Sequence, residues 1–125
     1  MKTISTEAAP AAIGPYSQAV MVDGMLYTSG QIPLSPKTGD IVVGGVKEQA
    51  DQVMQNIEAV LKAAGTDFSK VVKTTCFLID MGDFAAFNEV YSKYFNAADK
   101  PARSCVAVAG LPRGVSVEVE VIAKV

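Results

Sequence analysis

The segment from Val115 to Ala123 alternates strictly between two kinds of side chain. One face of this segment carries the valines at positions 115, 117, 119 and 121. The other face carries Ser116, Glu118, Glu120 and Ile122. A period of two predicts a β-strand with one face in the core and one face that displays two carboxylates. The fold must therefore contain a sheet with one apolar and one partly polar face.

Two segments have the periodicity of amphipathic helices. The first runs from about Val46 to Ala64, and Gly65 directly after it is a typical residue for ending a helix. The second begins after Asp83, a candidate N-cap, and carries aromatic residues at helical spacing. These aromatics are Phe84, Phe87, Tyr91 and Tyr94. We interpret them as core residues, because apolar residues at this spacing form the buried face of a helix.

The remaining apolar runs predict further strands. Asp23-Gly24 joins two such runs within residues 19–28, which favours a hairpin with a type I′ turn. Residues 41–43, 71–79 and 101–108 predict three more strands. The order β-β-(β)-α-β-α-β-β indicates one α+β domain over residues 1–125, with a single mixed sheet and both helices on one face. We expect self-association to cover the other face.

Arg103 lies inside an otherwise uncharged run, residues 101–108, which is typical of a buried strand. Moving a guanidinium from water into an apolar setting costs several kcal/mol unless hydrogen bonds and an anion meet it. If Val106 shares the face of the valine row, Arg103 lies on the face of Glu118 and Glu120. Two alternatives follow. Arg103 forms a structural ion pair with a glutamate, of the same chain or across a subunit boundary, or it receives a ligand carboxylate while a glutamate handles water or protons.

Composition excludes several classes of chemistry. The chain has no histidine, which excludes Ser-His-Asp, Cys-His and His-bearing zinc sites. Cys76 and Cys105 have no paired spacing and are expected to be reduced thiols in a cytoplasmic protein. A net charge of −2 with no basic block argues against a nucleic-acid partner. The sequence also shows no signal-peptide core and no long apolar run, so no membrane partner is expected.

Several short motifs occur in a consistent order along nearly the whole chain. They are Gly14-Pro-Tyr-Ser-Gln-Ala, Thr28-Ser-Gly-Gln-Ile-Pro, Lys73-Thr-Thr-Cys-Phe-Leu, Phe87-Asn-Glu-Val-Tyr and Pro101-Ala-Arg-Ser-Cys-Val, followed by Val117-Glu-Val-Glu. In this combination the chain resembles the RidA/YjgF family. The resemblance implies a chorismate-mutase-like α+β subunit and a homotrimer with ligand clefts between subunits.

The resemblance also implies an activity, that of a 2-iminobutanoate/2-iminopropanoate deaminase. Such an enzyme hydrolyses the enamine and imine intermediates that pyridoxal-phosphate dehydratases release from threonine and serine, without a cofactor of its own. By the same resemblance, Arg103 holds the substrate carboxylate, while Glu118 and the backbone carbonyl of Cys105 place the attacking water. Four further residues are expected to line the cleft: Tyr16, Ser29, Gly30 and Asn88.

Other functions remain open at this point. A non-catalytic regulatory or chaperone-like trimer could use Arg103 to capture a 2-oxo acid without turnover. A ribonuclease or translation inhibitor is disfavoured by the missing histidine and by the near-neutral charge. A chorismate mutase ranks last, because its dicarboxylate substrate needs more than one cation.

Overall fold

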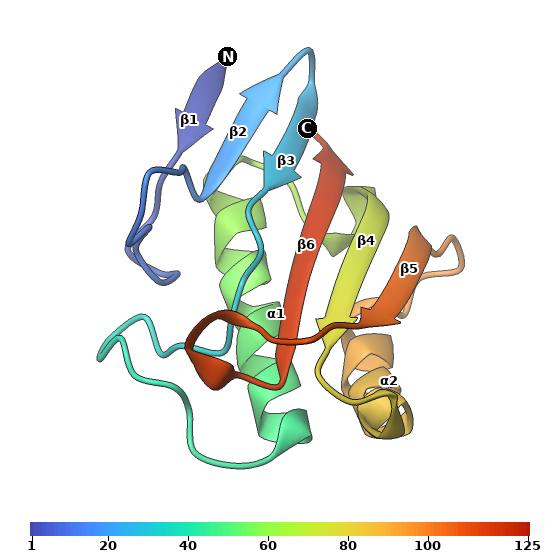
Figure 1. Cartoon of the computed structure of the whole chain (residues 1–125). Helices are drawn as coiled ribbons and strands as arrows, with labels where there is room; N and C mark the ends of the chain where they lie inside the picture. Colours follow the sequence, from blue (N-terminus) through green and yellow to red (C-terminus); the bar gives the residue numbers. More distant parts are fainter.

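The computed structural model describes all 125 residues and contains one mixed sheet of six strands with two helices (Figure 1). The strands are β1 (Lys2–Ile4), β2 (Ala19–Val22), β3 (Met25–Thr28), β4 (Val71–Leu78), β5 (Ala102–Ala107) and β6 (Val117–Lys124). The helices are α1 (Val46–Ala63) and α2 (Phe84–Tyr94). The strand order is β1-β2-β3-β6-β4-β5, and only β4 and β5 pair in parallel. The predicted α+β class is confirmed.

Both helices lie behind the sheet in Figure 1, and the face toward the viewer carries no helix. The valine row of β6 packs toward the helices and is buried, as its alternation predicts. Glu118 and Glu120 lie on the opposite face and are half-buried. We call this helix-free side the open face. One-sided helix cover is therefore confirmed, and a polar stripe crosses the centre of the uncovered side.

The hairpin turn and the helix end that the sequence predicted both occur in the structure. Asp23 and Gly24 have φ angles of 52° and 75°, which are the positive values of a type I′ turn between β2 and β3. Helix α1 ends as expected at Gly65, whose φ is +83°. There the N–H of Thr66 donates to the carbonyl of Leu61 at 3.0 Å, which is the long hydrogen bond of a Schellman motif.

Three details differ from the prediction. Strand β1 was not predicted, because three residues are too few to display a period. Residues 41–43 form no strand: only an isolated bridge joins Ile41 to Leu34. The side chain of Asp83 makes no capping hydrogen bond; Asp80 instead accepts the N–H of Gly82 at 2.8 Å and caps a short 3₁₀ turn that leads into α2. No helix combines the length and the apolar character needed to cross a bilayer.

Candidate functional site

Strand register places Arg103 on the helix-covered face of the sheet. Arg103 lies opposite Thr74 of β4, and Thr74 lies opposite Val121 of the buried valine row. Side chains at directly paired positions share a face. Arg103 and Glu118 are therefore on opposite faces, and the predicted common face is wrong. Alternation assigns faces within one strand, whereas the relation between strands depends on a register that alternation does not encode.

Strand β5 is also less buried than predicted. It is the last strand of the sheet, and its side chains are half-buried or exposed. Val106 pairs with Phe77, which pairs with Glu118, so Val106 lies on the open face with 45% of its surface exposed. An apolar run does not distinguish a central strand from an edge strand that a partner covers.

Helix α2 surrounds the guanidinium of Arg103 with neutral groups. Nη1 of Arg103 donates a hydrogen bond to Oδ1 of Asn88 at 2.6 Å. The guanidinium carbon lies 4.7 Å from the ring centroid of Tyr91 and 5.3 Å from that of Phe84. These three residues follow one another at spacings of four and three, so one stripe of the helix faces the arginine.

No carboxylate pairs with Arg103. The one ion pair in the structure joins Lys47 and Glu89 at 2.5 Å, on the surface. The hydrogen bond to Asn88 is the only one that the Arg103 side chain makes. The alternative of a structural ion pair with a glutamate of the same chain is therefore wrong. A half-buried cation that lacks an anion, with most of its N–H groups unused, is suited to an anionic ligand.

Cys105 lies two residues beyond Arg103, on the same face, and is half-buried. The N–H of Val108 donates to the carbonyl of Leu78 at 2.8 Å, which fixes the phase of the parallel ladder between β4 and β5. Because alternate residues of an edge strand point away from its partner, the N–H and carbonyl groups of Arg103 and Cys105 face the free edge. Burial raises the pKa of the Cys105 thiol and outweighs the charge of Arg103, which lowers it. The thiol is therefore neutral at neutral pH. The backbone carbonyl of Cys105, and not its thiol, is therefore the group suited to accepting a hydrogen bond from a ligand or water.

Glu118 forms a second cluster with Gly30. The absence of a side chain at Gly30 leaves the space that the Glu118 carboxylate occupies: a Cβ there would lie 2.7 Å from Cδ of Glu118. Two backbone hydrogen bonds between Gln31 and Val119, of 2.8 and 3.2 Å, hold the Gly30 segment beside β6. Burial, and secondarily the charge of Glu120, raise the pKa of Glu118 above its ordinary value of 4.5. This carboxyl group is suited to exchanging protons with water.

Ser29 and Tyr16 belong to the same end of the sheet as Gly30. The hydroxyl of Ser29 donates to the carbonyl of Ser17 at 2.6 Å, and this bond ties the end of β3 to the segment that carries Tyr16. Tyr16 has half of its surface exposed, and its phenol oxygen accepts the N–H of Ile13 at 3.4 Å. The phenol O–H of Tyr16 remains available as a donor.

The predicted site residues therefore fall into two groups within one chain, which we call half-sites. The helix-face half consists of Asn88, Arg103 and Cys105, and the open-face half consists of Ser29, Gly30 and Glu118, with Tyr16 nearby. Strand β4 separates β5 from β6, so the two halves lie two strand spacings apart, roughly 10 Å, in addition to being on opposite faces. The predicted residues do not assemble into one cleft within a single chain.

Sequence reasoning missed the contacts of Phe84 and Tyr91 with Arg103. We interpreted both residues as core, and Tyr91 is indeed buried. The guanidinium carbon of Arg103 nevertheless lies over its ring, and its hydroxyl lies 2.8 Å from Oγ1 of Thr74. The spacing of Asn88 relative to Phe84 and Tyr91 could have indicated that all three residues lie on one helix face.

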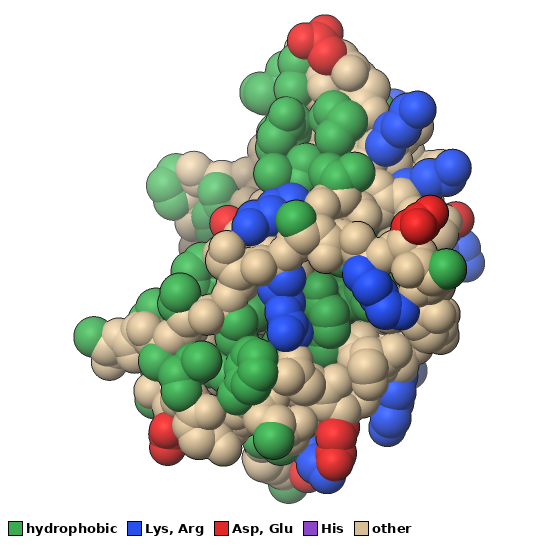
Figure 2. Space-filling model, turned by 90° about the vertical axis from the view of Figure 1, so that its right-hand side faces the viewer, with side chains coloured by type: hydrophobic (Ala, Val, Ile, Leu, Met, Phe, Trp, Pro, Cys, Tyr) green, Lys and Arg blue, Asp and Glu red, His purple; other side chains and the backbone are tan.

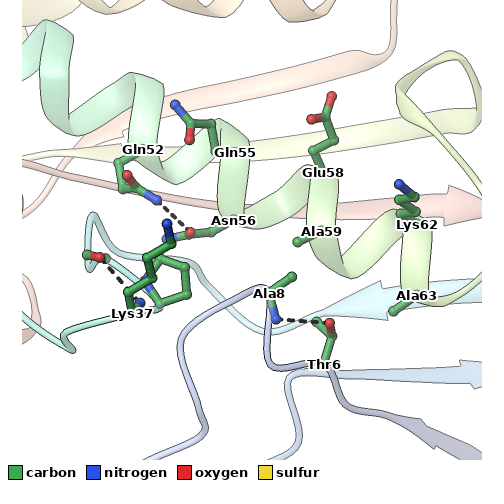
Figure 3. Close-up of a pocket in the computed structure, with 12 residues that line it drawn as sticks. Thr6, Ala8, Lys37, Gln52, Gln55, Asn56, Glu58, Ala59, Lys62 and Ala63 are labelled. Carbon is green, nitrogen blue, oxygen red and sulfur yellow. Dashed lines mark hydrogen bonds between the residues drawn. The ribbon is translucent and has the colours of Figure 1, made fainter.

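The β5 edge and the groove beside α1 are different parts of the surface. Figure 2 faces this edge and shows Lys and Arg side chains around a hollow with a hydrophobic floor. A groove of about 720 Å³ lies elsewhere, between α1 and the loops at residues 6–8 and 35–37 (Figure 3). Its one buried polar side chain, Asn56, already bonds to Gln52 and to two backbone carbonyls. That groove contains none of the predicted site residues.

This fold and these half-sites define an α+β protein that displays an unpaired arginine at the edge of its sheet and a carboxyl group on its open face. Residues 6–125 match the family described as Endoribonuclease L-PSP. The chain belongs to this family, which is the RidA/YjgF family that its motifs indicated.

Named relatives cover nearly the whole chain. A mouse protein named 2-iminobutanoate/2-iminopropanoate deaminase is 57% identical, over 98% of this chain and 90% of its own length. A Lactococcus lactis protein described as a candidate regulator, AldR, is also 57% identical, over 100% of this chain and 98% of its own. The crystal structure of E. coli TdcF with bound serine superimposes with a TM-score of 0.95 at 46% identity and covers 100% of this chain and 99% of that one.

Proposed function

We infer that this protein is a 2-iminobutanoate/2-iminopropanoate deaminase, an enzyme that hydrolyses 2-imino acids to 2-oxo acids and ammonia. The observation that carries this conclusion is the Arg103 guanidinium, held by Asn88 and two aromatic rings without an anion of the same chain. Full-length relatives that bear this name at more than 50% identity support it.

The substrate fits such an arginine. A 2-imino acid has a carboxylate next to the electrophilic carbon of a C=N bond. A planar guanidinium can bind that carboxylate through two parallel hydrogen bonds, which fixes the neighbouring carbon in position and orientation. Positioning of this kind lowers the barrier to attack by water, because the loss of translational and rotational freedom is already complete on binding.

Glu118 is our candidate for handling protons in this reaction. It takes a proton as water adds to the imine carbon, and the nitrogen gains a proton to give a tetrahedral amino alcohol. Collapse of that intermediate expels ammonia and leaves the 2-oxo acid. One water is consumed and no oxidant or reductant is needed. The edge-facing carbonyl of Cys105 can accept a hydrogen bond from the attacking water and orient it.

The other predicted residues take supporting roles in this proposal. Asn88 holds Arg103, and Gly30 gives room to the Glu118 carboxylate. Ser29 fixes the loop of Tyr16 through Ser17, and the phenol of Tyr16 can donate a hydrogen bond to substrate.

A complete site then requires a second copy of the chain. We propose a homotrimer in which the helix-face half of one copy meets the open-face half of its neighbour. The unpaired backbone groups along β5 and the exposed apolar side chains Val106 and Tyr27 on the open face are surfaces that such an assembly would cover.

A coupled assay tests the activity. With threonine dehydratase generating the imine, wild-type protein should accelerate the appearance of 2-oxobutanoate, and Arg103→Ala should abolish the acceleration. The other arginine provides a matched control: Arg113 is exposed and bonds only to the carbonyl of Gly39, so Arg113→Ala should behave as wild type. No acceleration by wild-type protein would contradict the proposal. If wild-type protein then bound 2-oxobutanoate without turnover, the regulatory alternative would be supported instead.

A further inference from the structure

Arg103, Tyr91 and Thr74 form one connected unit across α2, β4 and β5. We propose that the rings of Tyr91 and Phe84 are a platform that positions the Arg103 guanidinium for carboxylate binding, and that the Thr74 hydroxyl fixes the Tyr91 ring. Tyr91 is in this view a positioning residue that acts through Arg103. The effect of this platform on turnover rests on the proposed function. Its effect on ligand binding does not, and binding is the direct test.

Three side chains of α2 contact the guanidinium. The two ring centroids lie 4.7 and 5.3 Å from its central carbon, within the range of cation–π contact. Asn88 occupies one N–H group through its 2.6 Å hydrogen bond. A long arginine side chain at a sheet edge otherwise samples many rotamers, and holding it in one of them is what a two-point contact with a carboxylate requires.

Thr74 fixes the ring of Tyr91. It lies directly opposite Arg103 in the sheet, it is completely buried, and its Oγ1 is 2.8 Å from the Tyr91 hydroxyl. Burial raises the pKa of Tyr91, so the phenol stays protonated at neutral pH. The platform therefore contacts the cation without supplying a negative charge that would compete with a ligand.

Tyr94 provides a matched control on the same helix. Its hydroxyl donates to Oδ1 of Asp51 at 2.6 Å and joins α2 to α1. Neither a hydrogen bond nor a cation–π contact joins it to Arg103, although it is three residues from Tyr91. Tyr94→Leu removes a tyrosine ring from α2 just as Tyr91→Leu does, and it should leave ligand affinity unchanged.

The direct test is titration of 2-oxobutanoate into the full-length protein by calorimetry. Tyr91→Leu should weaken binding about ten-fold, and Tyr91→Phe, which keeps the ring, should stay within about three-fold of wild type. Phe84→Leu should weaken binding about three-fold. Because Phe84 is only half-buried, Phe84→Leu is expected to fold, and it tests the platform even if Tyr91→Leu does not fold. Wild-type affinity in Tyr91→Leu and Phe84→Leu, or no saturable binding by wild-type protein, would overturn the proposal.

Steady-state kinetics provide a second test, because a purely structural role of Tyr91 would not change KM. Poor positioning of Arg103 should raise KM for the imine in Tyr91→Leu more than it lowers kcat. Partial unfolding would instead lower kcat at constant KM. If wild-type protein bound 2-oxobutanoate in a Tyr91-dependent way but accelerated no imine hydrolysis, the deaminase assignment would fail while the platform would stand.

Discussion

Arg103 and Glu118 lie on opposite faces of one sheet, on strands that β4 separates. Each residue has the surroundings that its proposed role needs. Arg103 has no anionic partner, and Glu118 occupies the space that Gly30 leaves. Neither can serve the other within one chain. The two halves must therefore come from different copies if they act on one substrate, and this requirement can be tested directly.

Mixing two inactive variants should restore activity. Arg103→Ala and Glu118→Gln should each be inactive alone. When they are denatured and refolded together, random association should give about a quarter of the sites both intact residues, and hence about a quarter of the wild-type rate in the coupled assay. Refolding each variant separately before mixing provides the control. Mixed samples that stay inactive, together with an active wild type treated in the same way, would contradict a shared site.

Replacing Glu118 should lower activity without loss of stability. Loss of a group that transfers protons predicts a rate decrease of about 100-fold or more for Glu118→Gln. In the wild type, the rate should fall as pH drops through the raised pKa of Glu118, so this acid limb should lie above 4.5. Steady-state rates between pH 4 and pH 8 check both points. An acid limb that persists in Glu118→Gln would assign it to another group.

The same raised pKa has a consequence for folding. The folded protein holds the Glu118 proton more tightly than the unfolded chain does, so the free energy of unfolding falls as pH rises from the unfolded pKa to the folded one. Above that interval, Glu118→Gln should unfold at a higher urea concentration than the wild type, and below it the difference should shrink. Urea titrations at pH 4 and pH 8 measure this. A less stable variant at pH 8 would show that the carboxylate is stabilised by contacts that burial alone does not reveal.

Gly30→Ala should damage the site while leaving the fold intact. The added methyl group would overlap the carboxyl end of Glu118 and displace it, so we expect kcat to fall about 10-fold or more, in line with the loss of general acid–base positioning. Gly45→Ala is the control, since a Cβ at Gly45 meets nothing within 4 Å and the residue has a φ of −91°. Equal rates for the two variants would show that Glu118 tolerates displacement.

Asn56 should contribute mainly to stability. It is 1% exposed, and its amide donates to the carbonyls of Ile32 and Leu34 at 3.2 and 3.0 Å, which fixes the segment that follows Gly30. Asn56→Ala leaves the Leu34 carbonyl without this donor, while the Ile32 carbonyl keeps the N–H of Leu34 at 2.8 Å, and the variant should lower the free energy of unfolding by about 2 kcal/mol. Asn96→Ala, at an exposed site, should change it by less than about 0.5 kcal/mol. Chemical denaturation compares the two, and similar losses would show that the buried hydrogen bonds contribute little.

Features set by neighbouring residues could be predicted from the sequence. The Asp23-Gly24 turn, the end of α1 at Gly65 and the buried valine row of β6 each depend on local conformation or on alternation within one strand. The family could also be identified, because its motifs are short and ordered.

The relation between distant segments could not be predicted in this way. The face of Arg103 depends on the pairing of β5 with β4 and of β4 with β6, and alternation within each strand is compatible with either face. The contact of Tyr91 with Arg103 was missed for a related reason: an aromatic residue on the buried side of a helix looks the same whether it packs against leucine or against a cation. The resemblance had implied clefts between subunits, and the register adds that one chain cannot bring Arg103 and Glu118 together.

The placement of the two half-sites on opposite faces also constrains how copies can combine. In the proposed assembly, each chain gives its arginine to one neighbour and its glutamate to another. A pair of chains joined through one such contact would leave one Arg103 and one Glu118 outside any complete site. In a closed ring, every Arg103 and every Glu118 would belong to a complete site. A closed ring would therefore have more complete sites per chain than an open pair, and separated chains would have none, so activity per chain should fall as dilution takes the ring apart.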